Sequence, residues 1–337
     1  MERYPMKSPA NLPLLLEGFF TQRLMAQRQA SPHTIGSYRD TFRLFLSFAE
    51  KRLKRPPSKL AFADLGAPLI TSFLNELENK RANSARSRNL RLAAIRSFFR
   101  YAALEAPEHS ALIQRVLSIP SKRHTRPLID FLVRPEIEAL VAAPSCQTWI
   151  GQRDHAFLLL AVQTGLRLSE LTGLRQQDVA LGSGAHVRCV GKGRKERATP
   201  LTKPTARAVA AWIKRHGPDR SAFLFPSARG GRLSADAAQS LVTRHFTAAQ
   251  KGCPSLATKR VTPHVLRHTA AMELLQAGVD RALIAIWLGH ESVETTQIYL
   301  DANLALKEEI LDKTRPIQSR PGRYRPGDRL LNFLKGL

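Results

Sequence analysis

Four short segments in the second half of the chain combine residue types that can bind an anion or transfer a proton. In the first, Arg167 stands at the start of a predicted helix, and Glu170 follows three residues later on the same helical face. By itself this spacing is typical of an ordinary intrahelical ion pair. An arginine can also present a planar fork of N–H donors to two phosphate oxygens, which a lysine cannot do.

The second segment places three basic side chains on one face of a predicted helix. His264 and Arg267 are one helical turn apart, and His268 follows His264 by four residues. A lone histidine on a helix is usually structural, but a face made of His, Arg and His is poor core material. This segment therefore favours a functional site.

The third segment is the glycine-flanked turn G-K-G-R at 191–194 of a predicted hairpin. Lys192 would lie at the tip, where a long flexible cation can reach into a DNA groove. Arg194 and Lys195 add positive charge beside it, and we expect both to contact DNA. Lysines in such turns are also common in ordinary hairpins, so the segment counts only together with the others.

In the fourth segment, His290 precedes Tyr299 by nine residues, and Tyr299 is the one tyrosine between Ala102 and Arg323. The chain offers no convincing carboxylate cluster for magnesium, no Cys-x-x-Cys pair and no Walker motif. We therefore expect a site that uses no metal ion and no cofactor.

The charge of the chain indicates the kind of partner. Its 337 residues include 52 Lys and Arg against 27 Asp and Glu, a formal net charge of +25. Nucleic acid is the foremost polyanion, because neutralised phosphates supply affinity whatever the base sequence. A membrane surface would need a basic amphipathic anchor or an apolar span of about 18 residues, and residues 1–10 do not resemble a signal peptide. We expect a cytoplasmic protein that binds double-stranded DNA and no membrane.

The first hundred residues are expected to form a helical unit. Apolar residues recur at helical spacing over 11–30, 32–50, 69–77 and 84–103, and Ser31-Pro32 suits a helix start. In the last helix arginines alternate with apolar residues, which predicts an outward basic face for the DNA backbone; a solvated charged face is the alternative. The arginines predicted to contact DNA are Arg86, Arg88, Arg91 and Arg96.

The rest of the chain is expected to be mainly helical with a small β-hairpin, an α+β class. A polar, aperiodic stretch over 107–130 suits a linker, and a basic tail covers 313–337. The predicted strands are 186–190 and 197–201. The predicted helices are 134–143, 151–164, a short one from 167, 204–216, 234–250, 264–277, 280–288 and 293–304.

Taken together, the four segments resemble the motifs of the tyrosine recombinases, which include phage integrases and Xer resolvases. T-G-L-R-L-S-E-L, G-K-G-R-K-E-R-A-T-P-L, H-V-L-R-H-T and L-G-H followed by I-Y occur here in the order of that family. The resemblance covers about residues 31 to 305 and is most specific in the catalytic half. It implies a helical, SAM-like core-binding domain over 1–106 and a catalytic domain over 131–312. The tail beyond Tyr299 is longer and more basic than in Xer-like members.

The resemblance also implies residue roles. The six catalytic residues would be Arg167, Lys192, His264, Arg267, His290 and Tyr299, supported by Glu170 and His268. Tyr299 would attack a phosphodiester and form a 3′-phosphotyrosyl bond close in energy to the bond broken, so no ATP is needed. The arginines and His290 would hold the transition-state charge without a metal ion. His264 would take the tyrosine proton, and Lys192 would protonate the leaving 5′-oxygen.

The setting in which such an enzyme acts stays open. The tail favours integration or excision of a mobile element, by a homotetramer on two DNA sites. An Xer-type chromosome or plasmid dimer resolvase is the first alternative, and a type IB topoisomerase is a second. A non-catalytic architectural DNA-binding protein is the alternative of another class. A partner recombinase or an accessory DNA-bending factor would fit any of the recombinase readings.

Overall fold

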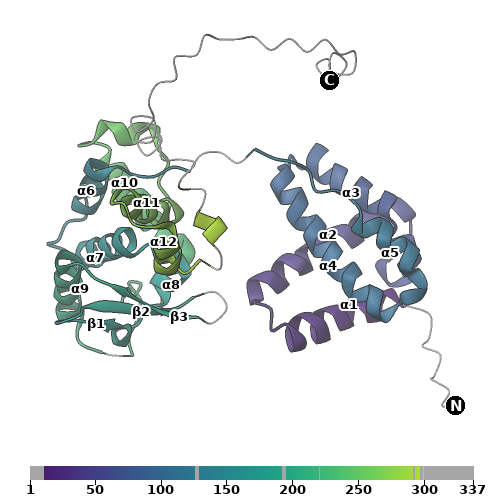
Figure 1. Ribbon diagram of the computed structural model, residues 1–337, viewed down its shortest axis with the longest axis horizontal. Helices are drawn as coiled ribbons and strands as arrows, with labels where there is room; N and C mark the ends of the chain where they lie inside the picture. The colour runs from purple at the N-terminus through teal and green to yellow at the C-terminus, as the bar shows by residue number, and fades with distance from the viewer. Residues whose placement is uncertain are drawn as a thin grey trace, which may run out of the picture. The chain divides into compact units, whose positions relative to one another are not determined.

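The computed structural model describes residues 11–125, 129–191, 195–219, 221–290, 293–296 and Tyr299. The chain divides into two compact units, 1–126 and 127–337 (Figure 1), and each unit has its own apolar core. The first unit is helical, and the second is mainly helical with a small antiparallel sheet. The fold class predicted from the sequence is therefore confirmed.

The first unit is built around one long helix, α4, which packs against α1, α2, α3 and α5. Its elements are α1 (Leu12–Gly18), the π-helical η1 (Phe19–Gln27), α2 (Pro32–Leu53), the 3-10 turns η2 (Pro57–Lys59) and η3 (Phe62–Asp64), α3 (Ala67–Asn79), α4 (Ala85–Glu105), the 3-10 turn η4 (Pro107–His109) and α5 (Ser110–Leu117). The predicted start of α2 is confirmed, since Ser31 Oγ accepts the Thr34 N–H at 3.2 Å and Pro32 follows as the first helical residue.

The predicted linker over 107–130 is wrong for its first part. Residues of α5 and the turn after it belong to the first unit, where Ile113, Val116 and Ile119 are buried in the core. A helix of eight residues offers barely two turns of periodicity, so it does not stand out in a polar stretch.

The outward basic face predicted for α4 is also partly wrong. Arg88 is 4% exposed, with its Nε 3.5 Å from Glu78 Oε2 and a donor to the Pro120 carbonyl. Arg96 donates to the Ile119 carbonyl. Residues 119–122, which were predicted to belong to the linker, lie on this face of α4, and the two arginines hold them there.

The remaining two arginines of that face differ in exposure. Arg91 is half-buried and donates to the Ser37 carbonyl at 3.2 Å and to Thr41 Oγ1 at 2.9 Å, which ties α4 to α2. Arg86 is exposed. Of the four arginines, Arg86 is therefore the one for which we still predict a contact with DNA.

In the second unit helices surround a small sheet. Its elements are α6 (Arg134–Ala142), α7 (Trp149–Thr164), α8 (Leu168–Gly173), the 3-10 turn η5 (Gln176–Asp178), β1 (Val179–Ala180), β2 (His186–Val190), β3 (Glu196–Pro200), α9 (Lys203–His216), α10 (Ala235–Ala249), the 3-10 turn η7 (Pro254–Thr258), α11 (Pro263–Gln276), α12 (Arg281–Leu288) and the 3-10 turn η8 (Val293–Thr296). In Figure 1 the strands lie together at one side of the unit. Helix α7 is its centre and packs against α6, α9 and α11.

The hairpin predicted from the glycine-flanked turn is confirmed. Strands β2 and β3 pair antiparallel with Cys189 opposite Arg197, and the Gly191 N–H donates to the Lys195 carbonyl at 2.8 Å. A two-residue strand, β1, joins the outer side of β2 and was not predicted, because two residues carry no periodicity.

A positive φ ends α7 directly before the first motif arginine. Gly165 has φ +62° and its N–H donates to the Ala161 carbonyl at 3.0 Å, as its predicted place at the helix end requires. A Cβ on Gly165 would lie 2.6 Å from Leu288 Cδ2, so a side chain there would push α12 away. Gly165 thus allows the start of α8 and the end of α12 to approach each other.

The helix predicted over 293–304 is described only in part. Residues 293–296 form a 3-10 turn rather than an α-helix, and its later residues other than Tyr299, like the basic tail over 313–337, lie outside the described residues. None of the described helices is long and apolar enough to cross a membrane.

Candidate active site

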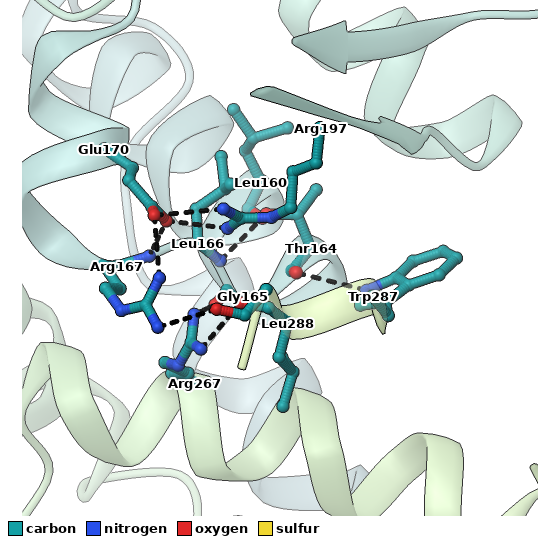
Figure 2. Close-up of polar contacts among 11 residues, drawn as sticks. Leu160, Thr164, Gly165, Leu166, Arg167, Glu170, Arg197, Arg267, Trp287 and Leu288 are labelled. Carbon is teal, nitrogen blue, oxygen red and sulfur yellow. Dashed lines mark hydrogen bonds and ion pairs between the residues drawn. The ribbon is translucent and has the colours of Figure 1, made fainter. Parts of the chain in front are cut away.

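Two arginines from separate motifs of the second unit, Arg167 and Arg267, lie side by side (Figure 2). Arg267, on α11, is 4% exposed; its Nη1 donates to the Gly165 carbonyl at 2.6 Å and its Nη2 to the Leu288 carbonyl at 2.8 Å. Burial and the nearby Arg167 lower the pKa of Arg267 to about 10. It therefore stays charged at neutral pH, and two backbone carbonyls fix its guanidinium.

Arg167 is held at the N-cap of α8. Its backbone N–H donates to Glu170 Oε2 at 2.7 Å, its Nη1 to Glu170 Oε1 at 3.0 Å, and its Nη2 to the Gly289 carbonyl at 2.9 Å. The intrahelical pair considered from the sequence is thus present. Each guanidinium has five N–H donors, so in both arginines the described contacts leave donors for an anion.

A third arginine in the cluster, Arg197, was not predicted from the sequence to be a site residue. It lies on β3 and donates through Nη1 to Glu170 Oε1 at 3.0 Å and through Nη2 to Oε2 at 2.7 Å. Burial alone would raise the pKa of Glu170 and lower that of Arg197, but hydrogen bonds between them outweigh burial, so the pKa of Glu170 is lowered and that of Arg197 raised. The strand alternation that turns Arg197 and Thr199 inward is the signal that could have found it.

Tyr299 is buried beside Arg267 and the histidines of α11. Its side chain is 2% exposed and packs in a small apolar cluster with Met272, Ile284 and Leu288. Its hydroxyl lies 3.2 Å from His268 Nδ1. Burial raises the pKa of Tyr299, while Arg267 and Arg167 act in the opposite direction.

Two further histidines surround the tyrosine. The His290 ring is stacked on that of Tyr299 with centroids 6.3 Å apart, and His290 Nδ1 lies 3.0 Å from Thr296 Oγ1. His264 is exposed and its ring packs edge to face on His268 with centroids 4.3 Å apart. The structure therefore brings five of the six predicted catalytic residues into one region, together with both supporting residues.

Some predicted residues fall elsewhere. Lys192 and Arg194 lie outside the described residues, while Lys195 is exposed at the end of the hairpin turn. In the part of the chain that the structure describes, no group of three or more His, Cys, Asp or Glu side chains could hold a metal ion.

The histidines predict how stability depends on pH. Burial lowers the pKa of His268 and of His290 to about 4, with positive charge from Arg267 adding to the effect on both. An unfolded histidine has a pKa of about 6.5. Between these values the unfolded chain binds protons that the folded chain does not, so the free energy of unfolding falls as pH decreases from about 6.5 towards 4, by on the order of a few kcal/mol.

Urea unfolding at pH 7.5 and pH 5, followed by tryptophan fluorescence, would measure this. Trp149, Trp212 and Trp287 are the three tryptophans of the chain and all lie in the second unit. Replacing His268 and His290 with glutamine should reduce the loss of stability at pH 5. An equal loss in wild-type and doubly substituted protein would contradict the lowered pKa values.

Comparison with known proteins identifies the family of the chain. The model of the phage integrase family matches residues 130–305, and that of the phage integrase N-terminal SAM-like domain matches 18–106. A putative integrase/recombinase of Sinorhizobium fredii, y4rC, is 62% identical over 98% of this chain and 100% of its own length. Tyrosine recombinase XerC of Rhodospirillum centenum is 36% identical over 88% of this chain and 85% of its own length.

A solved structure shows the same fold. The XerH site-specific recombinase bound to palindromic difH substrate has a TM-score of 0.67 at 23% identity, over 85% of this chain and 81% of that one. The chain belongs to the phage integrase family of tyrosine recombinases, whose members cut and rejoin DNA through a phosphotyrosyl intermediate. The family inferred from the four motifs is confirmed.

Proposed function

We propose that this protein is a site-specific recombinase that cuts and rejoins double-stranded DNA with Tyr299 as its nucleophile. The observation that carries the proposal is the cluster itself: two fixed guanidiniums, Arg167 and Arg267, beside a tyrosine whose hydroxyl contacts a histidine. The 52 Lys and Arg against 27 Asp and Glu supply attraction for DNA.

The two arginines would bind the non-bridging oxygens of the scissile phosphate. Attack by a hydroxyl builds negative charge on these oxygens, and donors already fixed by Glu170 and by backbone carbonyls need no rearrangement to meet it. His290, neutral at pH 7 because its pKa is about 4, could donate one further hydrogen bond. Lys192 would protonate the leaving 5′-oxygen.

Two histidines would handle the tyrosine proton. His268 lies within hydrogen-bond distance of the hydroxyl, and its pKa of about 4 keeps it neutral and able to accept that hydrogen bond. His264 packs on His268 and is the general base that the family resemblance implies. We propose that His268 orients Tyr299 and that His264 takes its proton. Because Tyr299 is buried, its hydroxyl must move towards the phosphate when DNA binds.

The biological role is proposed on the relatives. Two relatives named putative integrase/recombinase, at 62% and 42% identity, favour integration or excision of a mobile element, by a homotetramer on two DNA sites. The XerC relatives, at up to 36% identity, keep dimer resolution as the second candidate. We propose the second unit as the catalytic domain and the first as a core-binding domain that extends beyond the predicted end at 106 through α5.

Recovery of protein–DNA adducts tests this function. Cells that express the protein are lysed in denaturant, the covalently attached DNA is isolated, and its ends are sequenced. We expect adducts that map to one inverted-repeat site. Adduct formation by purified protein on that DNA should stay within about twofold when EDTA is added, because guanidiniums rather than a metal ion stabilise the charge. DNA binding without any adduct would favour an architectural protein.

A further inference from the structure

The carboxylate of Glu170 accepts hydrogen bonds from two arginines, which bind it with different geometry. Arg197 meets it with both ends of its guanidinium, at 3.0 and 2.7 Å, which is the bidentate geometry of the strongest carboxylate pairs. Arg167 meets it with a backbone N–H and one end of its guanidinium, while its other end donates to the Gly289 carbonyl. The tighter ion pair is therefore the one with Arg197 (Figure 2).

Exposure separates the two arginines further. The side chains of Glu170 and Arg197 are 4% and 13% exposed, whereas that of Arg167 is 30% exposed. Arg197 is thus turned into the protein beside its carboxylate, and Arg167 is the member of the group that a bound phosphate can reach. We propose that Arg197 is a positioning residue that neutralises Glu170 and so leaves the charge of Arg167 for the phosphate.

The charges of the cluster explain why neutralisation of Glu170 by Arg197 would affect phosphate binding. Among the described residues of the cluster, three guanidiniums, those of Arg167, Arg197 and Arg267, face one carboxylate. With Arg197 in place, Glu170 can orient Arg167 without cancelling its charge. Without Arg197, the full charge of a buried carboxylate would oppose Arg167, where low polarity makes the interaction strong. The inference rests on the proposed function, since it assigns Arg167 to the phosphate.

The backbone around Arg197 is shaped for its guanidinium. A Cβ on Gly289, where φ is +64°, would lie 2.9 Å from Arg197 Nη1, and a Cβ on Gly191 would lie 3.0 Å from the same atom. The turn after α12 and the start of the hairpin turn therefore both close on this side chain. Because the Gly289 carbonyl also accepts from Arg167, the packing of Arg197 sets a second contact of Arg167.

If Arg197 acts by balancing charge, a second substitution at Glu170 should partly restore the rate that Arg197→Met loses. Arg197→Met leaves Arg167 to balance the charge of Glu170 and should slow adduct formation about a hundredfold, as if Arg167 were lost as a fixed donor to the phosphate. Glu170→Gln leaves one acceptor oxygen, which keeps one of the two hydrogen bonds from Arg167, and should cost less than about tenfold. Arg197→Met combined with Glu170→Gln removes one charge of each sign, so it should be about tenfold faster than Arg197→Met alone.

The measurement is the single-turnover rate of adduct formation on the duplex recovered from wild-type adducts, with a urea unfolding curve for each variant. Arg197→Lys keeps the charge without the fork and should lie within about tenfold of wild type, which provides a folded variant if Arg197→Met is unstable. Arg188→Met is the matched control, because Arg188 is an exposed arginine on the neighbouring strand β2; its rate should stay within about threefold of wild type.

The outcomes separate the two proposals. A double variant faster than Arg197→Met, while not more stable in urea than the wild type, supports charge balance. A double variant as slow as Arg197→Met or slower, as expected if Arg197 only holds the fold together, overturns it. Wild-type protein that binds DNA and forms no adduct contradicts the proposed function, and this role with it.

Discussion

Tyr299→Phe is expected to lower covalent attachment of DNA by more than about a thousandfold, since the variant has no hydroxyl to attack the phosphate. The fold should survive the change. The ring would keep its place in the apolar cluster with Met272 and Leu288, and the described contact that is lost is the one with His268. DNA binding should therefore stay within about threefold of wild type, because the arginines and the rest of the positive charge are unchanged.

Gel-shift titration and denaturing-gel detection of adducts, on the same DNA, would measure binding and attachment separately. Tyr38→Phe is a matched control: Tyr38 is half-buried and its ring is stacked on Phe19 in the first unit, so its loss should leave adduct formation intact. Adducts that persist in Tyr299→Phe would show that another residue is the nucleophile.

Arg267→Lys is expected to lower the rate of adduct formation by on the order of a hundredfold to a thousandfold. A single ammonium nitrogen cannot take the places of both Nη1 and Nη2, which lie 2.6 and 2.8 Å from the Gly165 and Leu288 carbonyls, and also present a planar fork of donors to a phosphate. The variant should also lose stability, by about 1 to 3 kcal/mol for a carbonyl left without its donor.

A loss of stability has to be separated from a loss of chemistry. Arg153→Lys provides the comparison, since Arg153 is 6% exposed, lies in the same unit and donates to the Pro226 carbonyl at 2.8 Å. It should destabilise the second unit to a similar extent while the adduct rate, measured where both variants are folded, stays within about threefold of wild type. If both variants lose the same activity, Arg267 is a structural residue and not a phosphate ligand.

Local signals in the sequence predicted much of the fold. Ser31-Pro32 and Gly165 act through contacts within four residues of themselves, so they mark the ends of α2 and α7 without knowledge of the fold. The hairpin follows in the same way from its glycine-flanked turn. The motif order likewise identified the family, and the structure brings Arg167, Arg267 and Tyr299 together as that order implies.

The errors concern residues whose surroundings come from distant parts of the chain. Arg88 has a sequence context that suits an exposed basic face, and it is buried because residues 119–122 fold back over α4. Arg197 stands within a recognised motif, but its partner Glu170 is 27 residues away on α8, and only the folded unit brings β3 and α8 together. His268 contacts the tyrosine hydroxyl. Which histidine of α11 does so depends on how the helix is rotated about its own axis, and the spacing of residues in the sequence does not show this.

Mass spectrometry of the trapped adduct tests the central claim most directly. After digestion of the DNA by nuclease and of the protein by trypsin, the bound nucleotide should remain on the peptide 282–307, in which Tyr299 is the sole tyrosine. The account predicts a nucleotide joined through its 3′-phosphate to Tyr299. A nucleotide on any other residue, or one joined through a 5′-phosphate, would contradict it.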